Sequence, residues 1–165
     1  MPGVANWVNR LAPVRTVMNR VLGLDRRRTL PEFRRALTAA QISSRPGINA
    51  GGPVIALFAD CFTTHNETGV GLAAKAVLEA FGYRVRLVNA GCCGRAMIST
   101  GMLARAIQSV DSTLERLQPV IEDDAVQAVV VCEPSCLSAI KDDWLQLKLA
   151  APLALRQKQI GRAHV

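Results

Sequence analysis

Residues 89–96, Asn89-Ala90-Gly91-Cys92-Cys93-Gly94-Arg95-Ala96, decide how the rest of this sequence is interpreted. They follow an alternating apolar run over 83–88, which is typical of a strand, and they open a segment whose apolar residues have helical spacing. Two adjacent thiols therefore lie at a strand-to-helix turn. The flanking glycines tolerate the positive φ of a tight turn around a bound group, and the first helix amides together with Arg95 favour the thiolate form.

Two further strands are predicted on either side of this turn. Residues 53–60 form a nearly continuous apolar run, as expected of a parallel strand buried on both faces, and residues 125–131 form another. Helices are expected between the strands, at about 69–81 and 98–120. The order β-α-β-α-β predicts an α/β fold with a three-layer, Rossmann-like parallel sheet, preceded by a helical N-terminal segment.

The five cysteines follow the three predicted strands. Cys61 comes after the first strand, Cys92 and Cys93 after the second, and Cys132 and Cys136 after the third. Because ligands bind outside the carboxyl ends of parallel strands, all five are expected at one edge of the sheet, in a metal or redox site. Cys132 directly continues an apolar strand, so a position inside the core is the alternative for it.

Three kinds of chemistry are open to such a cluster. Iron–sulfur clusters are held by cysteine thiolates, commonly four, and a 4Fe-4S cluster is the first expectation. Structural zinc also accepts four thiolates, but it prefers paired cysteines two to four residues apart, and only Cys132 and Cys136 have that spacing. A disulfide between the adjacent Cys92 and Cys93 would be strained.

The excess of positive over negative charge lies in the N-terminal third of the chain. The net charge is +7, and residues 1–50 carry nine arginines against Asp25 and Glu32, which accounts for all of it. Amphipathic helices are expected there at 4–12 and 14–24. Nucleic acid or an anionic membrane surface would be attracted to this segment. The rest of the chain is neutral and lacks interleaved aromatic residues. We therefore expect the N-terminal segment to be a solvated helical linker, and we expect no nucleic-acid partner.

Hydropathy and the start of the sequence suggest a cytoplasmic location. No apolar run approaches the roughly 18 residues of a membrane span, and no leader pattern opens the chain. We therefore expect the thiols to meet a reducing cytosol, with a peripheral position at the inner face of the bacterial membrane as a further option. Five cysteines in such a chain indicate a metal or catalysis more than a disulfide framework.

Three stretches resemble a known family, the cysteine-rich CCG domain. They are Phe58-Ala59-Asp60-Cys61-Phe62, Gly91-Cys92-Cys93-Gly94-Arg95 and Glu133-Pro134-Ser135-Cys136. The domain occurs in the B subunit of heterodisulfide reductase and in iron–sulfur subunits of glycolate, lactate and glycerol-3-phosphate oxidoreductases. The sequence is most similar to the C-terminal part of FAD-binding oxidoreductases that act on D-2-hydroxy acids such as D-lactate or D-2-hydroxyglutarate.

The resemblance implies one part of a larger oxidoreductase. Its implied metal ligands are Cys92, Cys93 and Cys136, with Cys61 and Cys132 as further candidates, and its turn residues Gly91, Gly94 and Arg95 would surround the cofactor. No glycine-rich dinucleotide turn or ferredoxin-type cysteine run is present, so FAD belongs to the parent protein alone. The implied partners are its flavin and ferredoxin-like domains, a second CCG domain and a respiratory electron acceptor.

Departures from the family pattern affect single residues. Cys132 and Cys136 are separated by three residues where the fullest pattern has two, which weakens Cys132 as a ligand.

The last six residues, 160–165, look like the translation of a sequencing adapter. We therefore divide the chain into a helical basic linker segment, 1–52, a cysteine-rich CCG domain, 53–155, and a non-native tail, 156–165.

Two function classes follow from these observations. The first is an electron-transfer domain of a flavin-dependent, iron–sulfur 2-hydroxy-acid dehydrogenase, a fragment that is not catalytic by itself. The second is a docking domain of the same enzyme without a bound cluster, and a zinc-stabilised domain is a third interpretation. His65 lies at the cysteine edge, but a lone loop histidine is usually solvated. Asp60 and Glu133 are expected to cap helices or bond loops.

Overall fold

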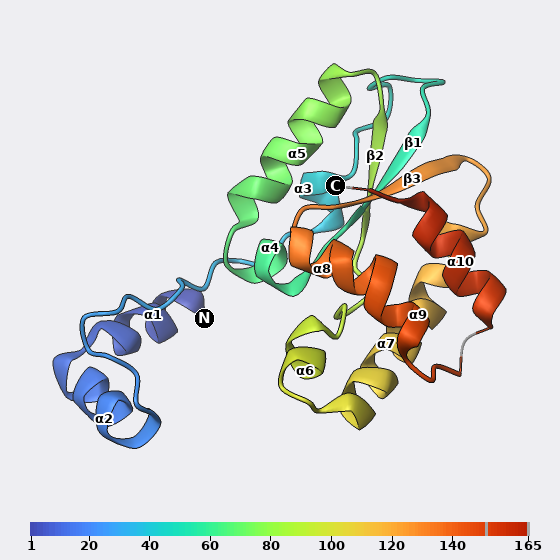
Figure 1. Cartoon of the computed structure of the whole chain (residues 1–165). Coiled ribbons are helices and arrows are strands. Elements are labelled where there is room, and N and C mark those ends of the chain that lie inside the picture. Colours follow the sequence, from blue (N-terminus) through green and yellow to red (C-terminus); the bar gives the residue numbers. More distant parts are fainter. Residues whose placement is uncertain (151, 165) are drawn as a thin grey trace.

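A parallel sheet carries the cysteine-bearing part of the chain. The computed structural model describes residues 1–150 and 152–164, and Figure 1 shows how they are arranged. The first three strands are β1, Val54–Phe58, β2, Arg84–Val88, and β3, Val126–Val131. They pair in parallel in the order β2-β1-β3, which confirms the predicted β-α-β-α-β core.

Helices cover both faces of this sheet. Helix α5, Thr68–Ala80, connects β1 to β2, and α7, Leu103–Ile121, connects β2 to β3. Leu57 of β1 packs with residues of α5, whereas the next residue, Phe58, packs with residues of α7. Because successive strand residues face opposite sides, one apolar strand contributes to both cores. The three-layer arrangement is therefore confirmed.

Helix α7 is shorter at its start than the sequence predicts. Instead of one helix from 98 to 120, a short α6, Arg95–Ser99, is separated from α7. Gly101, with φ +76°, turns the chain between them. The end of α7 agrees with the prediction to within one residue: the helix ends at Ile121, and Pro119 lies inside its last turn.

The segment after β3 is helical throughout its first part. Helix α8, Pro134–Ser138, runs directly into a π-helical turn, Ala139–Asp143, and then into α9, Trp144–Gln146. This helical start directly after β3 matters because it places Cys136 on a helix packed against the sheet.

Residues 37–52, the last part of the predicted linker segment 1–52, pack on the body of the protein. They contain a short helix, α3, Ala39–Ile42, and Ile42 is fully buried. The hydroxyl of Ser44 accepts a hydrogen bond from the Val85 amide (2.8 Å), and that of Ser43 accepts one from the Leu87 amide (3.1 Å). These bonds give hydrogen-bond partners to two backbone amides on the outer edge of β2.

The N-terminal helices lie away from the sheet in Figure 1. They are α1, Pro2–Arg10, and α2, Ala12–Leu22, close to the predicted ranges. Pro13, predicted to separate them, lies in the first turn of α2, where its missing N–H costs nothing. Within residues 1–150 and 152–164, none of the helices combines the length and the apolar character that crossing a membrane requires.

A short fourth strand joins the sheet near the end of the chain. Helix α10, Leu153–Arg162, leads into β4, Ala163–His164, which pairs in parallel with β3 through Ala163 and Val129. Two residues are too few for a periodic strand pattern, so the sequence does not reveal it. The origin of residues 156–165 stays a prediction, and Val165 lies outside the described residues.

Candidate metal centre

The turn after β1 is organised by a buried carboxylate. Asp60 is 1% exposed, and its Oδ1 accepts hydrogen bonds from the amides of Phe62 (3.0 Å) and Thr63 (2.9 Å). Its Oδ2 is buried with no hydrogen-bond partner among the described residues. This cap starts α4, Cys61–His65, directly at the cysteine, so the predicted capping role of Asp60 is confirmed and the predicted loop is a short helix.

The turn after β2 depends on two glycines with positive φ, Gly91 (+124°) and Gly94 (+80°). A Cβ on Gly91 would lie 2.8 Å from Thr113 Oγ1, and one on Gly94 would lie 2.9 Å from Val110 Cγ2. Both glycines therefore let the turn approach α7. Thr113 also donates a hydrogen bond to the Cys92 carbonyl (2.9 Å), which fixes the turn against that helix.

The turn after β3 is capped in the same way as the first. The Glu133 carboxylate accepts hydrogen bonds from the Ser135 amide (3.3 Å) and hydroxyl (2.7 Å). Pro134 occupies the start of α8, where a proline fits. Cys136 is thereby placed in the first turn of α8 and is 6% exposed.

Four of the five cysteines meet at this edge of the sheet. The Sγ atoms of Cys93 and Cys136 are 3.0 Å apart, and both residues are buried. The thiol of Cys61 interacts with the side chain of Cys92, the former exposed and the latter half-buried. Cys132 instead packs with the apolar cluster on the α5 face.

The contact between Cys93 and Cys136 separates their acidities. The hydrogen bond between the two thiols, helped by the Arg95 amide, lowers the pKa of Cys93 to about 7 against the effect of burial. The same hydrogen bond, with burial, raises the pKa of Cys136. Burial, and to a smaller extent the negative charge of Asp60, raises the pKa of Cys132 to about 11. Cys93 is therefore the thiol that ionises first among these three.

Arg95 acts through its backbone more than through its charge. Its amide supports the Cys93 thiolate, but its guanidinium is paired with Asp143 (3.2 Å). Trp144, fully buried, donates from Nε1 to the Cys93 carbonyl (2.9 Å). The sequence offers no signal for this role, because the contact joins positions 51 apart.

His65 lies close in sequence to the cysteines but faces outward. It is exposed, and its carbonyl accepts a hydrogen bond from the Arg34 amide (2.6 Å). With Phe33, Cys61 and Phe62, it lines an apolar groove where the N-terminal segment meets α4. Its surroundings are those of a solvated histidine.

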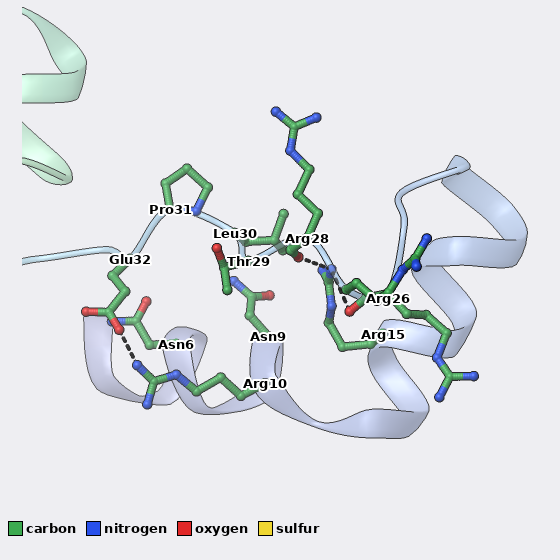
Figure 2. A pocket seen from close by; sticks show the side chains of 11 residues that line it. Asn6, Asn9, Arg10, Arg15, Arg26, Arg28, Thr29, Leu30, Pro31 and Glu32 are labelled. Carbon is green, nitrogen blue, oxygen red and sulfur yellow. Dashed lines mark hydrogen bonds and ion pairs between the residues drawn. The ribbon is translucent and has the colours of Figure 1, made fainter.

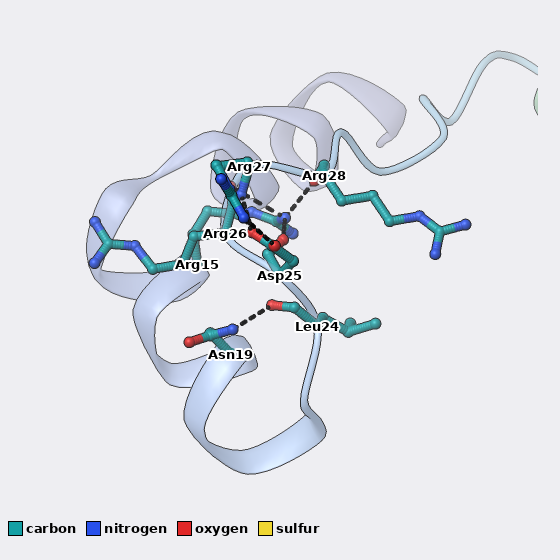
Figure 3. A network of polar contacts seen from close by, with 7 residues as sticks. All are labelled: Arg15, Asn19, Leu24, Asp25, Arg26, Arg27 and Arg28. Atoms are coloured by element: carbon teal, nitrogen blue, oxygen red, sulfur yellow. Dashed lines mark hydrogen bonds and ion pairs between the residues drawn. The ribbon is translucent and has the colours of Figure 1, made fainter.

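Several arginines of the N-terminal segment are engaged within that segment. Arg15, only 8% exposed, donates to the carbonyls of Asp25 (2.8 Å) and Arg28 and so closes the loop after α2 (Figure 3). Arg10 pairs with Glu32 at the rim of the adjoining pocket (Figure 2). The pocket is thus shaped by contacts within the segment.

The donor set at the sheet edge fits an iron–sulfur cluster in kind and number. Cys61, Cys92, Cys93 and Cys136 supply four thiols, the usual complement. Among the described residues, no three His, Cys, Asp or Glu side chains stand ready around a metal position. Two thiolates on tetrahedral zinc would be about 3.8 Å apart, so Cys93 and Cys136 would have to separate to share a metal.

Comparisons with known proteins agree with the sequence resemblance at the level of the family. Residues 55–141 match the model of the cysteine-rich domain CCG. The C subunit of anaerobic glycerol-3-phosphate dehydrogenase, from Escherichia coli strain K12 and from O157:H7, is 25% identical over 150 residues. The alignment covers 86% of this chain but only 36% of each relative, and no solved structure matches. The chain belongs to the CCG cysteine-rich domain family.

Proposed function

We propose that this chain is the cysteine-rich electron-transfer part of a flavin-dependent, iron–sulfur 2-hydroxy-acid dehydrogenase. The observation that carries the proposal is the meeting of four thiols, those of Cys61, Cys92, Cys93 and Cys136, at the carboxyl edge of three parallel strands. Similarity to part of a known dehydrogenase supports an oxidoreductase. The choice of a 2-hydroxy acid rests on the resemblance of the three cysteine motifs to FAD-linked enzymes of that class.

In this proposal Cys92, Cys93 and Cys136 hold the cluster, and Cys61 is the fourth ligand. When bound, an iron–sulfur cluster supplies one-electron transfer. The amide of Gly94, 3.4 Å from Cys92 Sγ, and that of Arg95 stabilise the thiolates. Buried Trp144 fixes the backbone of the turn and keeps water from its inner side.

The rest of the reaction belongs to the parent protein. FAD and the substrate pocket lie in a flavin domain, and a ferredoxin-like domain, and in some parents a second CCG domain, complete the electron path to a respiratory acceptor. We place this assembly in the cytoplasm, at the inner face of the bacterial membrane. The present chain by itself is expected to oxidise no substrate.

Metal analysis of protein made and kept without oxygen tests the proposal. Iron, sulfide and zinc are measured with the visible spectrum, on the wild type and on Cys92→Ser and Cys136→Ser. Cys132→Ser is the matched control because Cys132 packs on the opposite face. We expect a brown protein that loses iron and sulfide in the first two variants and keeps them in the control.

A docking domain without a cluster is the second candidate. The direct contact of Cys93 with Cys136 favours it, because sulfurs 3.0 Å apart are packed against each other rather than spread around a metal. It predicts colourless, folded, metal-free protein that neither substitution alters. Stoichiometric zinc without visible absorption would indicate a zinc-stabilised domain instead.

A further inference from the structure

The contact between Cys93 and Cys136 brings two thiols close enough to react with each other, which electron transfer through a cluster does not require. Their sulfurs are 3.0 Å apart, about 1 Å more than a disulfide bond. We propose that these two thiols are an oxidation site, which forms a reversible disulfide when the metal-free chain meets a hydroperoxide. The proposal concerns the metal-free chain and does not rest on the proposed cluster.

Neighbouring bonds hold the two sulfurs in this position. Trp144 Nε1 donates to the Cys93 carbonyl (2.9 Å), and Arg95 pairs with Asp143 (3.2 Å). Both links join the turn after β2 to the helical segment that carries Cys136. Closing the remaining distance therefore requires mainly small side-chain rotations, with little movement of the backbone.

The other cysteines form less suitable partners. Cys92 and Cys93 are adjacent in sequence, so a bond between them would be strained. Cys132 packs on the α5 face of the sheet, away from the pair. Cys61 interacts with Cys92 at the more exposed side of the group of thiols. Cys61 and Cys92 are therefore the pair that competes with Cys93 and Cys136 for disulfide formation.

The low exposure of the pair selects a small oxidant. Cys93 is 3% exposed and Cys136 is 6% exposed, which excludes bulky disulfide reagents more strongly than hydrogen peroxide. The flanking Cys92 is only half-buried, so solvent reaches the residue next to Cys93. A hydroperoxide therefore fits this site better than a peptide disulfide.

The reaction balances in two steps. One thiol attacks the peroxide, whose O–O bond breaks: two electrons pass from sulfur to oxygen, giving a sulfenic acid and an alcohol, or water from hydrogen peroxide. The second thiol then attacks the sulfenic sulfur, the S–O bond breaks and water leaves as the S–S bond forms. A dithiol reductant returns both thiols and becomes a disulfide itself.

Oxidation of this pair would compete with metal loading. Both sulfurs are proposed cluster ligands, and a disulfide sulfur is no longer a thiolate ligand. The bond would also join positions 43 apart, which restricts the unfolded chain and raises the thermal midpoint. The oxidised protein is therefore expected to be more stable. A loss of iron uptake until reduction is a separate consequence, which rests on the proposed function.

Peptide mapping of the full metal-free chain tests the assignment. Reduced protein is treated with one equivalent of hydrogen peroxide, its remaining thiols are alkylated, and it is digested with trypsin without reductant. Cleavage after Arg86, Arg95, Arg116 and Lys141 gives peptides 87–95 and 117–141, which contain Cys92 with Cys93 and Cys132 with Cys136. We expect these two peptides to be linked and to separate on treatment with a dithiol.

Single substitutions identify the bonded sulfurs. The link should persist in Cys92→Ser and Cys132→Ser and disappear in Cys93→Ser and Cys136→Ser. A wild type without the link, a link lost in Cys92→Ser or Cys132→Ser, or a bond from Cys61 to Cys92 alone would overturn the proposal. Iron content of anaerobic protein is a separate readout, so failure of the cluster proposal and failure of this one are distinguishable.

Discussion

The N-terminal helices and helix α7 carry similar apolar patterns but different degrees of burial. In α7 the stripe residues Leu114 and Leu117 are fully buried against the sheet. In α1 and α2 the corresponding Trp7 and Val21 are 62% and 73% exposed. Periodicity thus tells which face of a helix is apolar, whereas burial requires a second surface to pack against.

Polar contacts divide the molecule in the same way. In the cysteine edge, buried polar groups such as Asp60 and Thr113 fix turns that present thiols. In the N-terminal segment, Arg15 satisfies the carbonyls of its own loop. The first set organises a site, whereas the second organises only the local chain.

The two tryptophans give the largest expected contrast between these regions. Trp144→Ala removes a fully buried side chain and its hydrogen bond to the Cys93 carbonyl. We expect a loss of about 3–5 kcal/mol in the free energy of unfolding, as for other buried aromatic side chains. Trp7→Ala removes a side chain that is 62% exposed. Its effect should stay within about 0.5 kcal/mol, as for most surface substitutions. Urea unfolding measures both, and equal losses would mean that Trp7 is packed.

Two left-handed glycines give an intermediate contrast. Gly94→Ala combines a φ of +80° with a Cβ 2.9 Å from Val110 Cγ2, whereas Gly23→Ala has a φ of +67° with nothing within 4 Å. Left-handed backbone strain of about 1–2 kcal/mol applies to both variants. Overpacking adds about 1–3 kcal/mol at Gly94 alone. Thermal and urea unfolding of the two variants would separate the steric clash at Gly94 from the backbone strain that both variants share. A Gly23 variant as unstable as the Gly94 variant would remove the distinction.

The smallest effect concerns a carboxylate of the body. Hydrogen bonds from Lys75 (2.8 Å) and Ser44 (2.6 Å) hold the pKa of Glu79 below its ordinary value. A carboxylate with a lowered folded pKa adds stability above its unfolded pKa of about 4.3, and this stability is lost as pH falls through the folded pKa. Glu79→Gln should therefore cost about 0.5 kcal/mol at pH 7, and the difference from wild type should shrink below about pH 4.

The matched control for this effect is Glu32→Gln in the N-terminal segment. The side chain of its partner Arg10 is 73% exposed. Solvent therefore screens the pair, and no resolvable change is expected at either pH. Unfolding curves at pH 7 and pH 4 decide the comparison. A pH-independent loss in Glu79→Gln would show that packing, not charge, makes the contribution.

The sequence predicts the elements that are long enough to show a period. The three strands and α5 fall within about two residues of their predicted bounds. Helix α4 and strand β4 escape prediction, because five and two residues carry too little periodic signal. The burial of Ile42 escapes it as well, since a four-residue helix has no periodic signal and Ile42 is buried only by packing against β2 and α5.

The sequence by itself determined the succession of strands and helices along the chain and which turns receive cysteines, because strand and helix periods are local properties and parallel strands share one carboxyl edge. Only the tertiary structure decided which sulfurs meet. Cys93 contacts Cys136, 43 positions away, while Cys132 turns to the opposite face. These choices depend on helix packing and on a tryptophan bonded to a distant carbonyl, and such contacts leave no periodic trace in the chain.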